Sequence, residues 1–472
     1  MTGPFPTTAP PAPQQVLKEL LDLGGLDGAL AETVALTGSE PVLPSSYAVG
    51  TIAQATIAAT AVAAAELWTR RGGSPQDIAV DMRHAAIEFR SERLFRVDGQ
   101  PPNRLWDAIA GVYRTGNGRW VRIHTNFPHH RDGILALLGC AYERTAVQEA
   151  LMTWQAPAFE AAVAERGLVA TMMRSPQEWL AEPQGQALAT QALVSFEKIG
   201  ESPAEALEVA ERPLAGLRVL DLTRIIAGPV GGRALAAHGA EVMRIAGPHL
   251  PFIAPLVIDS GRGKLSAHID LRKETGRAAL TALLREADVF VQGYRPGVFA
   301  GHGFGPEEAA AIRPGIVYVS LCAYGYEGPW AGRRGFDSLV QTASGINHGE
   351  AEAAGIDGPR ELPCQALDHA SGYLMAFGAI AALRKRMLEG GSWHVRVSLA
   401  RTGRWLQSLG RVADGQACTE LESSAVEALL ERSDSGFGRL SAVRHAAVMS
   451  KTPPHFARPS VPLGSHPPRW PD

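Results

Sequence analysis

The sequence predicts an α/β protein in which a Rossmann-like, open parallel sheet is preceded by a smaller α+β domain. Two observations predict the sheet. Short apolar runs alternate with helical segments after residue 210, and the loops that follow these runs are rich in Gly and Arg. Such alternation is typical of βαβ units. The smaller domain is predicted because residues 16–210 combine helical segments with a hairpin signal and lack that alternation.

The first part of the chain is expected to begin with a disordered or extended lead-in, residues 1–15, which is rich in Pro. Apolar residues then recur at helical spacing in 16–36 and 52–71, and Gly72-Gly73 supplies a helix stop. Residues 77–87 alternate as a strand does. Residues 113–123 predict a hairpin that turns at Gly-Asn-Gly. Further helices are expected at 129–140, 147–166, 176–180 and 187–194.

The second part, residues 211–472, is expected to hold the sheet and a C-terminal tail. Its four clearest strands are predicted at 217–222, 241–245, 288–292 and 316–321. The helices among them are predicted at 230–238, 276–286 and 306–312. A longer helix over 369–388 leads to strand-like residues at 395–397.

Bulk composition excludes several classes of function. A chain of 472 residues predicts about two to three domains, and a formal net charge of −3 gives no general attraction for nucleic acid or an anionic membrane. The 4 Cys have neither metal nor redox spacing, so we expect no metal site and a reducing, cytoplasmic location. The apolar run 52–67 is shorter than the ~20 residues that span a bilayer, and the start of the chain lacks a secretory pattern.

The loops after the predicted strands indicate an anionic ligand. Open α/β sheets bind ligands at the carboxyl ends of their strands. The loops at those ends carry six cations: Arg224, Arg262, Lys264, Arg295, Arg333 and Arg334. A lone loop Arg is usually solvated, but several on one side favour a phosphorylated adenine carrier. The first strand is not followed by G-x-G-x-x-G, which argues against NAD or FAD.

Asp368, at the start of the helix over 369–388, is the candidate nucleophile. Its simplest role is an N-cap. The same position also suits catalysis, because a helix N-terminus favours the ionised carboxylate, which can attack an activated acyl group. His129-His130 is expected to be a solvated turn, and no Ser-His-Asp or Cys-His arrangement is evident.

Several segments of residues 216–400 resemble the family III CoA-transferases of the CaiB/BaiF type, which include formyl-CoA transferases, carnitine CoA-transferases and α-methylacyl-CoA racemases. The first reads Gly-Leu-Arg-Val-Leu-Asp-Leu-Thr-Arg-Ile-Ile-Ala-Gly-Pro at 216–229. The others lie at 238–245, 261–271, 294–298, 318–329 and 334–337. The resemblance implies the sheet architecture of that family and an interlocked homodimer.

The resemblance also implies a reaction and a set of site residues. Asp368 corresponds to the catalytic Asp of the family, which moves CoA from an acyl-CoA donor to a carboxylic acid through an aspartyl anhydride and an aspartyl-CoA thioester. CoA is then a substrate, and no tightly bound cofactor is implied. The residues expected to contact CoA are Arg224, Ile226, Ala227, Arg262, Lys264, Tyr294 and Arg295.

Departures from the family pattern leave alternatives open. Racemases of the family carry a His where this chain has Phe336, which favours transfer over racemisation. The segment after the second predicted strand lacks the usual Gly-Asp and Arg, and Gly293 replaces a commoner Asn. An acyl-CoA racemase, isomerase or lyase of the same fold, or a degenerate CoA-binding paralogue, remain the alternatives.

The first part of the chain resembles a later part of the same family. Residues 58–82 echo 376–399, since each has a small-residue helix, Gly-Gly-Ser and a strand. Aligning Gly72 with Gly390 places Gly50 opposite Asp368, so the repeat lacks the nucleophile. Residues 113–188 resemble the smaller domain of the family. We therefore expect one active site per chain, with the first part as its lid.

Overall fold

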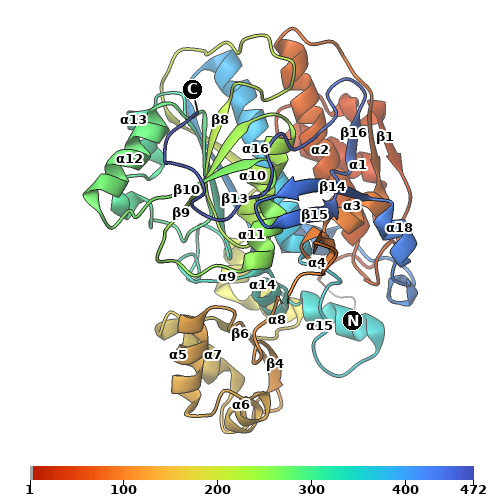
Figure 1. Ribbon diagram of the computed structural model, residues 1–472. Coiled ribbons are helices and arrows are strands. Elements are labelled where there is room, and N and C mark those ends of the chain that lie inside the picture. The colour runs from red at the N-terminus through yellow and green to blue at the C-terminus, as the bar shows by residue number, and fades with distance from the viewer. Residues whose placement is uncertain (1–3, 104, 472) are drawn as a thin grey trace.

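The computed structural model describes residues 4–103 and 105–471 as a large α/β body with a smaller body below it (Figure 1). Residues 1–3, at the start of the predicted lead-in, lie outside the described residues. The rest of the lead-in is extended up to Pro13, and the carbonyl oxygen of Thr8 accepts a hydrogen bond from the backbone N–H of Arg411 at 2.9 Å. This contact ties the start of the described chain to its second half.

The centre of the large body is a seven-stranded sheet in the order β10-β9-β8-β11-β12-β13-β7, parallel except for β7. This confirms the predicted α/β fold with an open, mostly parallel sheet. Chain order reverses between β8 and β11, which makes the ends of these two strands the switch point of the sheet. The strands are β7 (Ser195–Gly200), β8 (Arg218–Leu222), β9 (Glu241–Ala246), β10 (Lys264–His268), β11 (Val289–Gln292), β12 (Val317–Cys322) and β13 (Ser392–Ser398).

Alternate side chains of each strand face different helical layers, as the pleat requires. In β11, Phe290 packs into the core shared with α12 (Glu274–Arg285) and α13 (Pro306–Ile312). Its neighbours Val289 and Val291 pack into the core on the opposite face. That face is covered by α10 (Ala227–Ala237) and α16 (Ala366–Glu389).

Residues from the first part of the chain complete the large body. The long helix α2 (Val49–Arg70) packs against α16, and Figure 1 shows the two side by side. The remaining elements of this region are α1 (Pro13–Leu23), η1 (Gly28–Thr33), β1 (Val34–Thr37), β2 (Ile78–Asp81), α3 (Met82–Glu88), α4 (Ser91–Leu94) and β3 (Arg96–Val97). The division at residue 210 stays a prediction, but one hydrophobic core runs across it.

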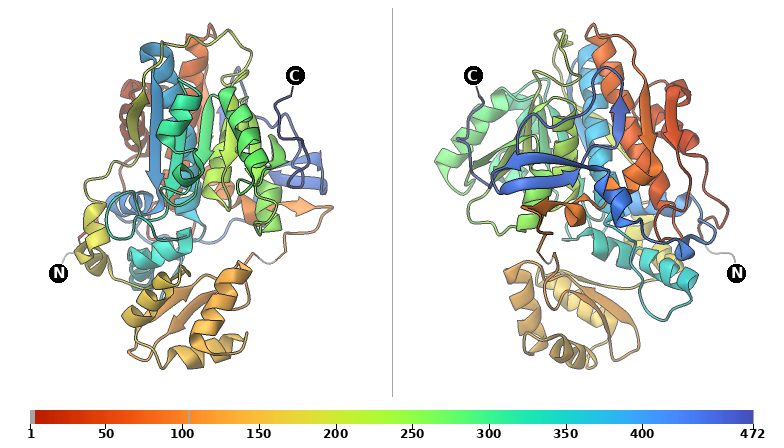
Figure 2. Two further views of the ribbon diagram at one scale, coloured as in Figure 1. Left: turned by 90° about the vertical axis from the view of Figure 1, so that its left-hand side faces the viewer. Right: turned by 45° about the vertical axis from the view of Figure 1, so that its right-hand side comes forward.

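The small body has its own core, formed between residues Ile109 and Met172 (Figure 2). It contains the predicted hairpin, β4 (Gly111–Arg114) with β5 (Trp120–Ile123), and β6 (Ala170–Met172) on the other edge of β5. Its helices are α5 (Pro128–Leu138), α6 (Arg144–Leu151) and α7 (Ala156–Glu165). Four helices lie between the two bodies: α8 (Pro176–Ala181), α9 (Pro183–Ala187), α14 (Asp337–Ala343) and α15 (Ile346–Ala354).

The C-terminal segment returns across both parts of the chain. Strand β16 pairs with β2, and the β14–β15 hairpin pairs with β3. The elements of this segment are α17 (Leu399–Ser408), η3 (Gly415–Ala417), α18 (Ser423–Glu427), β14 (Leu430–Ser435), β15 (Gly438–Val443) and β16 (Ala447–Met449). Earlier in the chain, the short helix η2 (Ala300–His302) precedes α13. These pairings hold the first part of the chain against the sheet.

Several sequence-based expectations differ from the structure. Residues 147–166 form two helices separated by a turn, and 77–87 contain a short strand that runs into α3. Of the helix expected at 187–194, only Ala187 is helical, as the last residue of α9. Strands β10 and β7 were not predicted, because the polar residues Lys264, Ser266 and Glu197 break the apolar pattern. Helices α2 and α16 are long and apolar enough to cross a membrane, but 89% and 100% of their most apolar windows are buried inside the protein.

Gly372 lets α16 approach α10. A Cβ added at Gly372 would lie 2.4 Å from the carbonyl oxygen of Ala227, a contact that side chains do not make. We expect Gly372→Ala to lower the free energy of unfolding by about 1–3 kcal/mol, as overpacking does. Urea unfolding measures this effect. Gly301→Ala, where an added Cβ meets nothing within 4 Å, is the control. Equal stability of both variants would contradict the close approach.

Candidate active site

A cleft of about 330 Å³ lies at the switch point of the sheet and extends to the small body. Residues after the ends of β8, β11 and β12 form one wall, and Phe127, His129 and His130 of the small body form part of the other. Four guanidinium groups line it: Arg224, Arg295, Arg333 and Arg334. No carboxylate belongs to its lining among the described residues. The cleft therefore favours an anionic ligand.

The structure brings four of the predicted CoA-contacting residues to this region. Arg224, Tyr294 and Arg295 line the cleft, and the guanidinium of Arg224 lies 5.0 Å from the ring of Phe127. Ile226 lines the adjoining cavity that contains Asp368. Ala227 is the first residue of α10 and contributes the carbonyl oxygen that faces Gly372.

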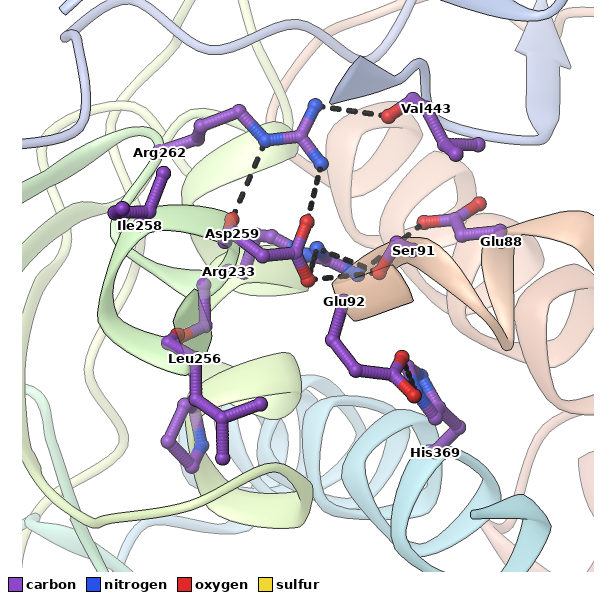
Figure 3. A network of polar contacts seen from close by, with 12 residues as sticks. Glu88, Ser91, Glu92, Arg233, Leu256, Ile258, Asp259, Arg262, His369 and Val443 are labelled. Carbon is purple, nitrogen blue, oxygen red and sulfur yellow. Dashed lines mark hydrogen bonds and ion pairs between the residues drawn. The ribbon is translucent and has the colours of Figure 1, made fainter. Parts of the chain in front are cut away.

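Two of the predicted CoA-contacting residues lie elsewhere, in buried ion pairs. Lys264 is 1% exposed, and its ammonium group donates to Asp221 and to the carbonyl oxygen of Pro229, both at 2.7 Å. Figure 3 shows Arg262 donating to Asp259 and to the carbonyl oxygen of Val443. Neither residue lines a described cavity. Their charges are neutralised inside the protein, so the structure assigns them to packing.

The carboxylate of Asp368 sits in the first turn of α16, two residues after the helix begins. It is not the N-cap that the sequence suggested, because Gln365 takes that place. The N–H of Asp368 donates instead to Oδ2 of Asp337 at 2.8 Å. Asp337, at the start of α14, thus caps α16 from outside the helix.

Two buried carboxyl groups therefore share one end of α16. Burial first, and then the negative charges of Asp337 and Glu92, raise the pKa of Asp368 well above its ordinary value. Burial also raises the pKa of Asp337 to about 6, against the backbone N–H groups of Asp368 and Leu367, which lower it. The expectation that the helix N-terminus holds Asp368 ionised is wrong, because Asp337 takes the N–H groups that would do so.

A cavity of about 40 Å³ covers Asp368 and shares Ile225 and Phe336 with the cationic cleft. Most of its wall is apolar, and its lining residues are Glu92, Arg93, Leu105, Trp106, His124, Asn126, Ile225, Ile226, Ile253, Leu256, Phe336, Gln365 and Asp368. The wall combines residues from both halves of the sequence. The nucleophile predicted in the second half thus faces side chains that the first half supplies.

Glu92 of α4 is fixed at this cavity by contacts to both halves of the chain. Its Oε2 lies 3.0 Å from Nε2 of His369, and its Oε1 accepts from Arg93 at 3.1 Å. Burial opposes ionisation, but the hydrogen bond from His369 and the charges of His369 and Arg93 hold the pKa of Glu92 below its ordinary value.

The helix α4 that carries Glu92 is tied to the second half through Ser91. The hydroxyl of Ser91 donates to Oδ2 of Asp259 at 2.8 Å, and Arg233 of α10 donates to the same oxygen at 2.7 Å (Figure 3). All three groups are buried. The network fixes α4 against α10 and thereby fixes Glu92 beside Asp368.

The sequence analysis did not assign Asp337, Glu92 or His124 to the site. It expected His129-His130 to be a solvated turn, whereas both residues lie in the first turn of α5 and His130 is buried. Asp337 lies in a segment that resembles the family, so its motif was a usable signal. The small-body histidines and Glu92 lie far from Asp368 in the sequence and carry no spacing pattern. Only the packing of the two parts of the chain brings them to the site.

Comparisons with known proteins show the family to which the chain belongs. The model of CoA-transferase family III matches residues 214–419. An acyl-CoA transferase of Gibberella moniliformis is 30% identical over 420 residues, which cover 79% of this chain and 73% of that protein. The acetyl-coenzyme A transferase nodX of Hypoxylon pulicicidum is 31% identical, over 66% of this chain and 56% of that protein.

Among solved structures, a hypothetical protein from Mycobacterium tuberculosis is 34% identical, with a TM-score of 0.39 over 42% of this chain and 58% of that one. The extent of the match to the fungal acyl-CoA transferase, together with the family model, establishes the relationship. The chain belongs to CoA-transferase family III, an enzyme family.

The raised pKa of Asp337 predicts a loss of stability with rising pH. The carboxyl group stabilises the fold below its unfolded pKa of about 4, and that contribution is lost as pH rises through about 6. The side chain of Asp337→Asn stays neutral at every pH. Between pH 4 and pH 8 the free energy of unfolding of this variant should therefore fall by about 3 kcal/mol less than that of the wild type. Urea unfolding at both pH values measures the difference. The exposed Asp434→Asn is the control, and parallel pH profiles for Asp337→Asn and wild type would contradict the prediction.

Proposed function

We propose that this protein is a CoA-transferase that moves CoA from an acyl-CoA donor to a carboxylic acid acceptor, with Asp368 as the covalent nucleophile. One observation carries the proposal: a buried carboxyl group lies in a small apolar cavity next to a cleft lined by four guanidinium groups. An acyl-CoA matches this arrangement, because it carries a neutral thioester at one end and phosphates at the other. The fungal relatives are named acyl-CoA and acetyl-coenzyme A transferases, which supports the same reaction class.

The proposed reaction consists of four displacements at carbonyl carbon. The carboxylate of Asp368 attacks the donor thioester, a C–O bond forms, the C–S bond breaks, and CoA thiolate leaves an acyl–aspartyl anhydride. The thiolate attacks the aspartyl carbon and releases the donor acid. The acceptor carboxylate then attacks the aspartyl-CoA thioester and frees the thiolate. The thiolate finally attacks the acceptor carbonyl, which restores Asp368. Each displacement is easier than direct exchange.

Asp368 must lose its proton before the first attack, and the closed cavity supports the steps that follow. Burial keeps water from the anhydride, which water would hydrolyse. Burial, and then the negative charges of Asp337 and Glu92, raise the pKa of Asp368 and so make its carboxylate more basic. The cavity volume of about 40 Å³ has room for roughly three water-sized groups, and its wall is mostly apolar. We therefore propose donor acids with short, uncharged acyl groups.

The cleft is proposed to hold the phosphates of CoA. Arg224 lies between the cleft and the loop at Pro251, whose carbonyl oxygen accepts its hydrogen bond. Arg295 is exposed at the same wall. The second wall comes from the small body, so CoA binding is expected to bridge both bodies. Acyl-CoA and a small carboxylic acid are the only partners that the proposed reaction requires.

Covalent trapping tests the nucleophile. Incubation with acyl-CoA thioesters of increasing chain length, followed by hydroxylamine and peptide mass spectrometry, should give a hydroxamate at Asp368 with acetyl- or propionyl-CoA. Asp368→Asn should give no adduct and should lower the rate of CoA exchange at least about 1,000-fold, because the covalent path is lost. Tight CoA binding without any adduct in the wild type would contradict the transferase and favour a CoA-binding paralogue.

Removal of one cleft cation should weaken CoA binding without slowing the chemistry. Arg295→Ala is expected to raise KM for the acyl-CoA about tenfold at low salt, roughly the loss of one charge-assisted hydrogen bond, with kcat nearly unchanged. The effect should shrink at high ionic strength. Arg432→Ala on β14, whose side chain is 76% exposed, is the control for a lost surface charge. An unchanged KM for Arg295→Ala would place the phosphates elsewhere.

A further inference from the structure

The proposed reaction needs a hydrogen-bond donor that the helix end does not supply. Each attack on a carbonyl carbon places negative charge on oxygen, and enzymes stabilise it with positioned donors. The N–H of Asp368 already donates to Asp337 at 2.8 Å, and the carboxyl group of Asp337 also accepts from the backbone of Leu367. The first turn of α16 therefore directs these N–H groups away from the substrate and toward Asp337.

Two other polar side chains at the cavity, Asn126 and Arg93, are engaged. The amide of Asn126 donates to the carbonyl oxygen of Leu105 at 2.9 Å, and its oxygen accepts the N–H of Asp107 at 2.9 Å. Arg93 donates to Glu92 and to the carbonyl oxygen of Pro363. These groups position the wall of the cavity rather than face a ligand.

His124 differs from these two side chains because its buried Nδ1 has no hydrogen-bond partner among the described residues. The side chain lines the cavity and is 4% exposed. Its Nδ1 is buried and has no hydrogen-bond partner within residues 4–103 and 105–471. An unsatisfied buried polar group destabilises a fold by about 1–3 kcal/mol. Because His124 lines a cavity, a ligand bound there can complete its hydrogen bonds.

The ring of His124 is nevertheless held in one place. It stacks on Phe336 with centroids 3.9 Å apart and an interplanar angle of 9°. The ring of Trp106 packs against it edge-on, with the two centroids 5.6 Å apart. The backbone N–H of His124 donates to Val169 within the small body at 3.2 Å. Aromatic packing thus fixes the ring, and the backbone hydrogen bond fixes the segment that carries it.

The ring is neutral at physiological pH. Burial, then the nearby charges of His130 and Arg122, lower the pKa of His124 to about 3. A neutral imidazole has one N–H to donate and adds no positive charge that would pair permanently with Asp368 or Glu92. At physiological pH the neutral ring therefore offers one N–H donor to a ligand.

We propose that His124 is a catalytic residue of the Asp368 site, whose ring N–H donates a hydrogen bond to the acyl oxygen of the bound substrate. The bond strengthens as that oxygen becomes an oxyanion, and it weakens again when the carbonyl re-forms. This inference rests on the proposed transferase function and deepens it. Its consequence is that the small body, which carries His124, completes the active site and does more than cover it.

The test compares His124→Phe with His124→Gln and the wild type. Phe keeps the stack on Phe336 but removes the donor, and Gln returns an N–H on a flexible chain. The rate constant for acyl transfer to Asp368 from propionyl-CoA should fall 100- to 1,000-fold in His124→Phe and recover at least tenfold in His124→Gln. KM for propionyl-CoA should change less than threefold, because the donor acts mainly in the transition state.

His238→Phe is the matched control. His238 is also buried, with neither ring nitrogen partnered among the described residues, but it follows the last residue of α10, roughly 16 Å along that helix from Ala227. Its substitution should leave the adduct rate within twofold of the wild type. If both variants slow the adduct equally, the effect is one of packing and the proposal is overturned.

The remaining outcomes separate this inference from the function on which it rests. An adduct at the wild-type rate in His124→Phe would overturn the role of His124 and leave the transferase intact. A rise in KM with unchanged kcat would also overturn it, because the ring would then bind substrate and transition state alike. Absence of an adduct in the wild type would overturn the proposed function itself, and the role of His124 with it.

Discussion

The N-terminal end of α16 is the constraint on which the rest of the site depends. Two carboxyl groups, Asp337 and Asp368, are buried there together, and the first accepts the N–H of the second at 2.8 Å. Burying both as charges is unfavourable, so the pKa of each is raised. The surroundings are organised around this arrangement: Gly372 lets α10 come close, and the apolar wall of the cavity excludes water.

The start of α2 provides an informative comparison with the start of α16. There the N–H of Thr51 donates to Oε1 of Glu40 at 2.7 Å, so this helix is also capped by a carboxylate from an earlier loop. Thr51, like Asp368, is the third residue of its helix, and Gly50 is the residue that the sequence alignment places opposite Asp368; neither carries a carboxyl group. The similar carboxylate caps of α2 and α16 favour the internal repeat. They also indicate that the cap belongs to the architecture, whereas a second carboxyl group in the turn is particular to α16.

The sheet could be predicted from the sequence because its signals are local. Strands β8, β9, β11 and β12 were found from apolar runs, and α13 was found with its observed limits. Asp368 was found because a carboxylate at the start of a long small-residue helix is a local pattern. Arg224 and Arg295 were found because strand ends share one edge of a parallel sheet.

The other parts of the site depend on contacts between distant segments. Arg262 and Lys264 resemble phosphate ligands in sequence, yet Asp259 and Asp221 neutralise them, and a buried cation without a partner would be strongly unfavourable. The sequence by itself determined the fold of the second half and the family, and it singled out Asp368 as the proposed nucleophile, since these depend on periodicity and short motifs. Only the tertiary structure decided which cations face the cleft and that His124 and Glu92 face Asp368, because burial and charge pairing are properties of packing.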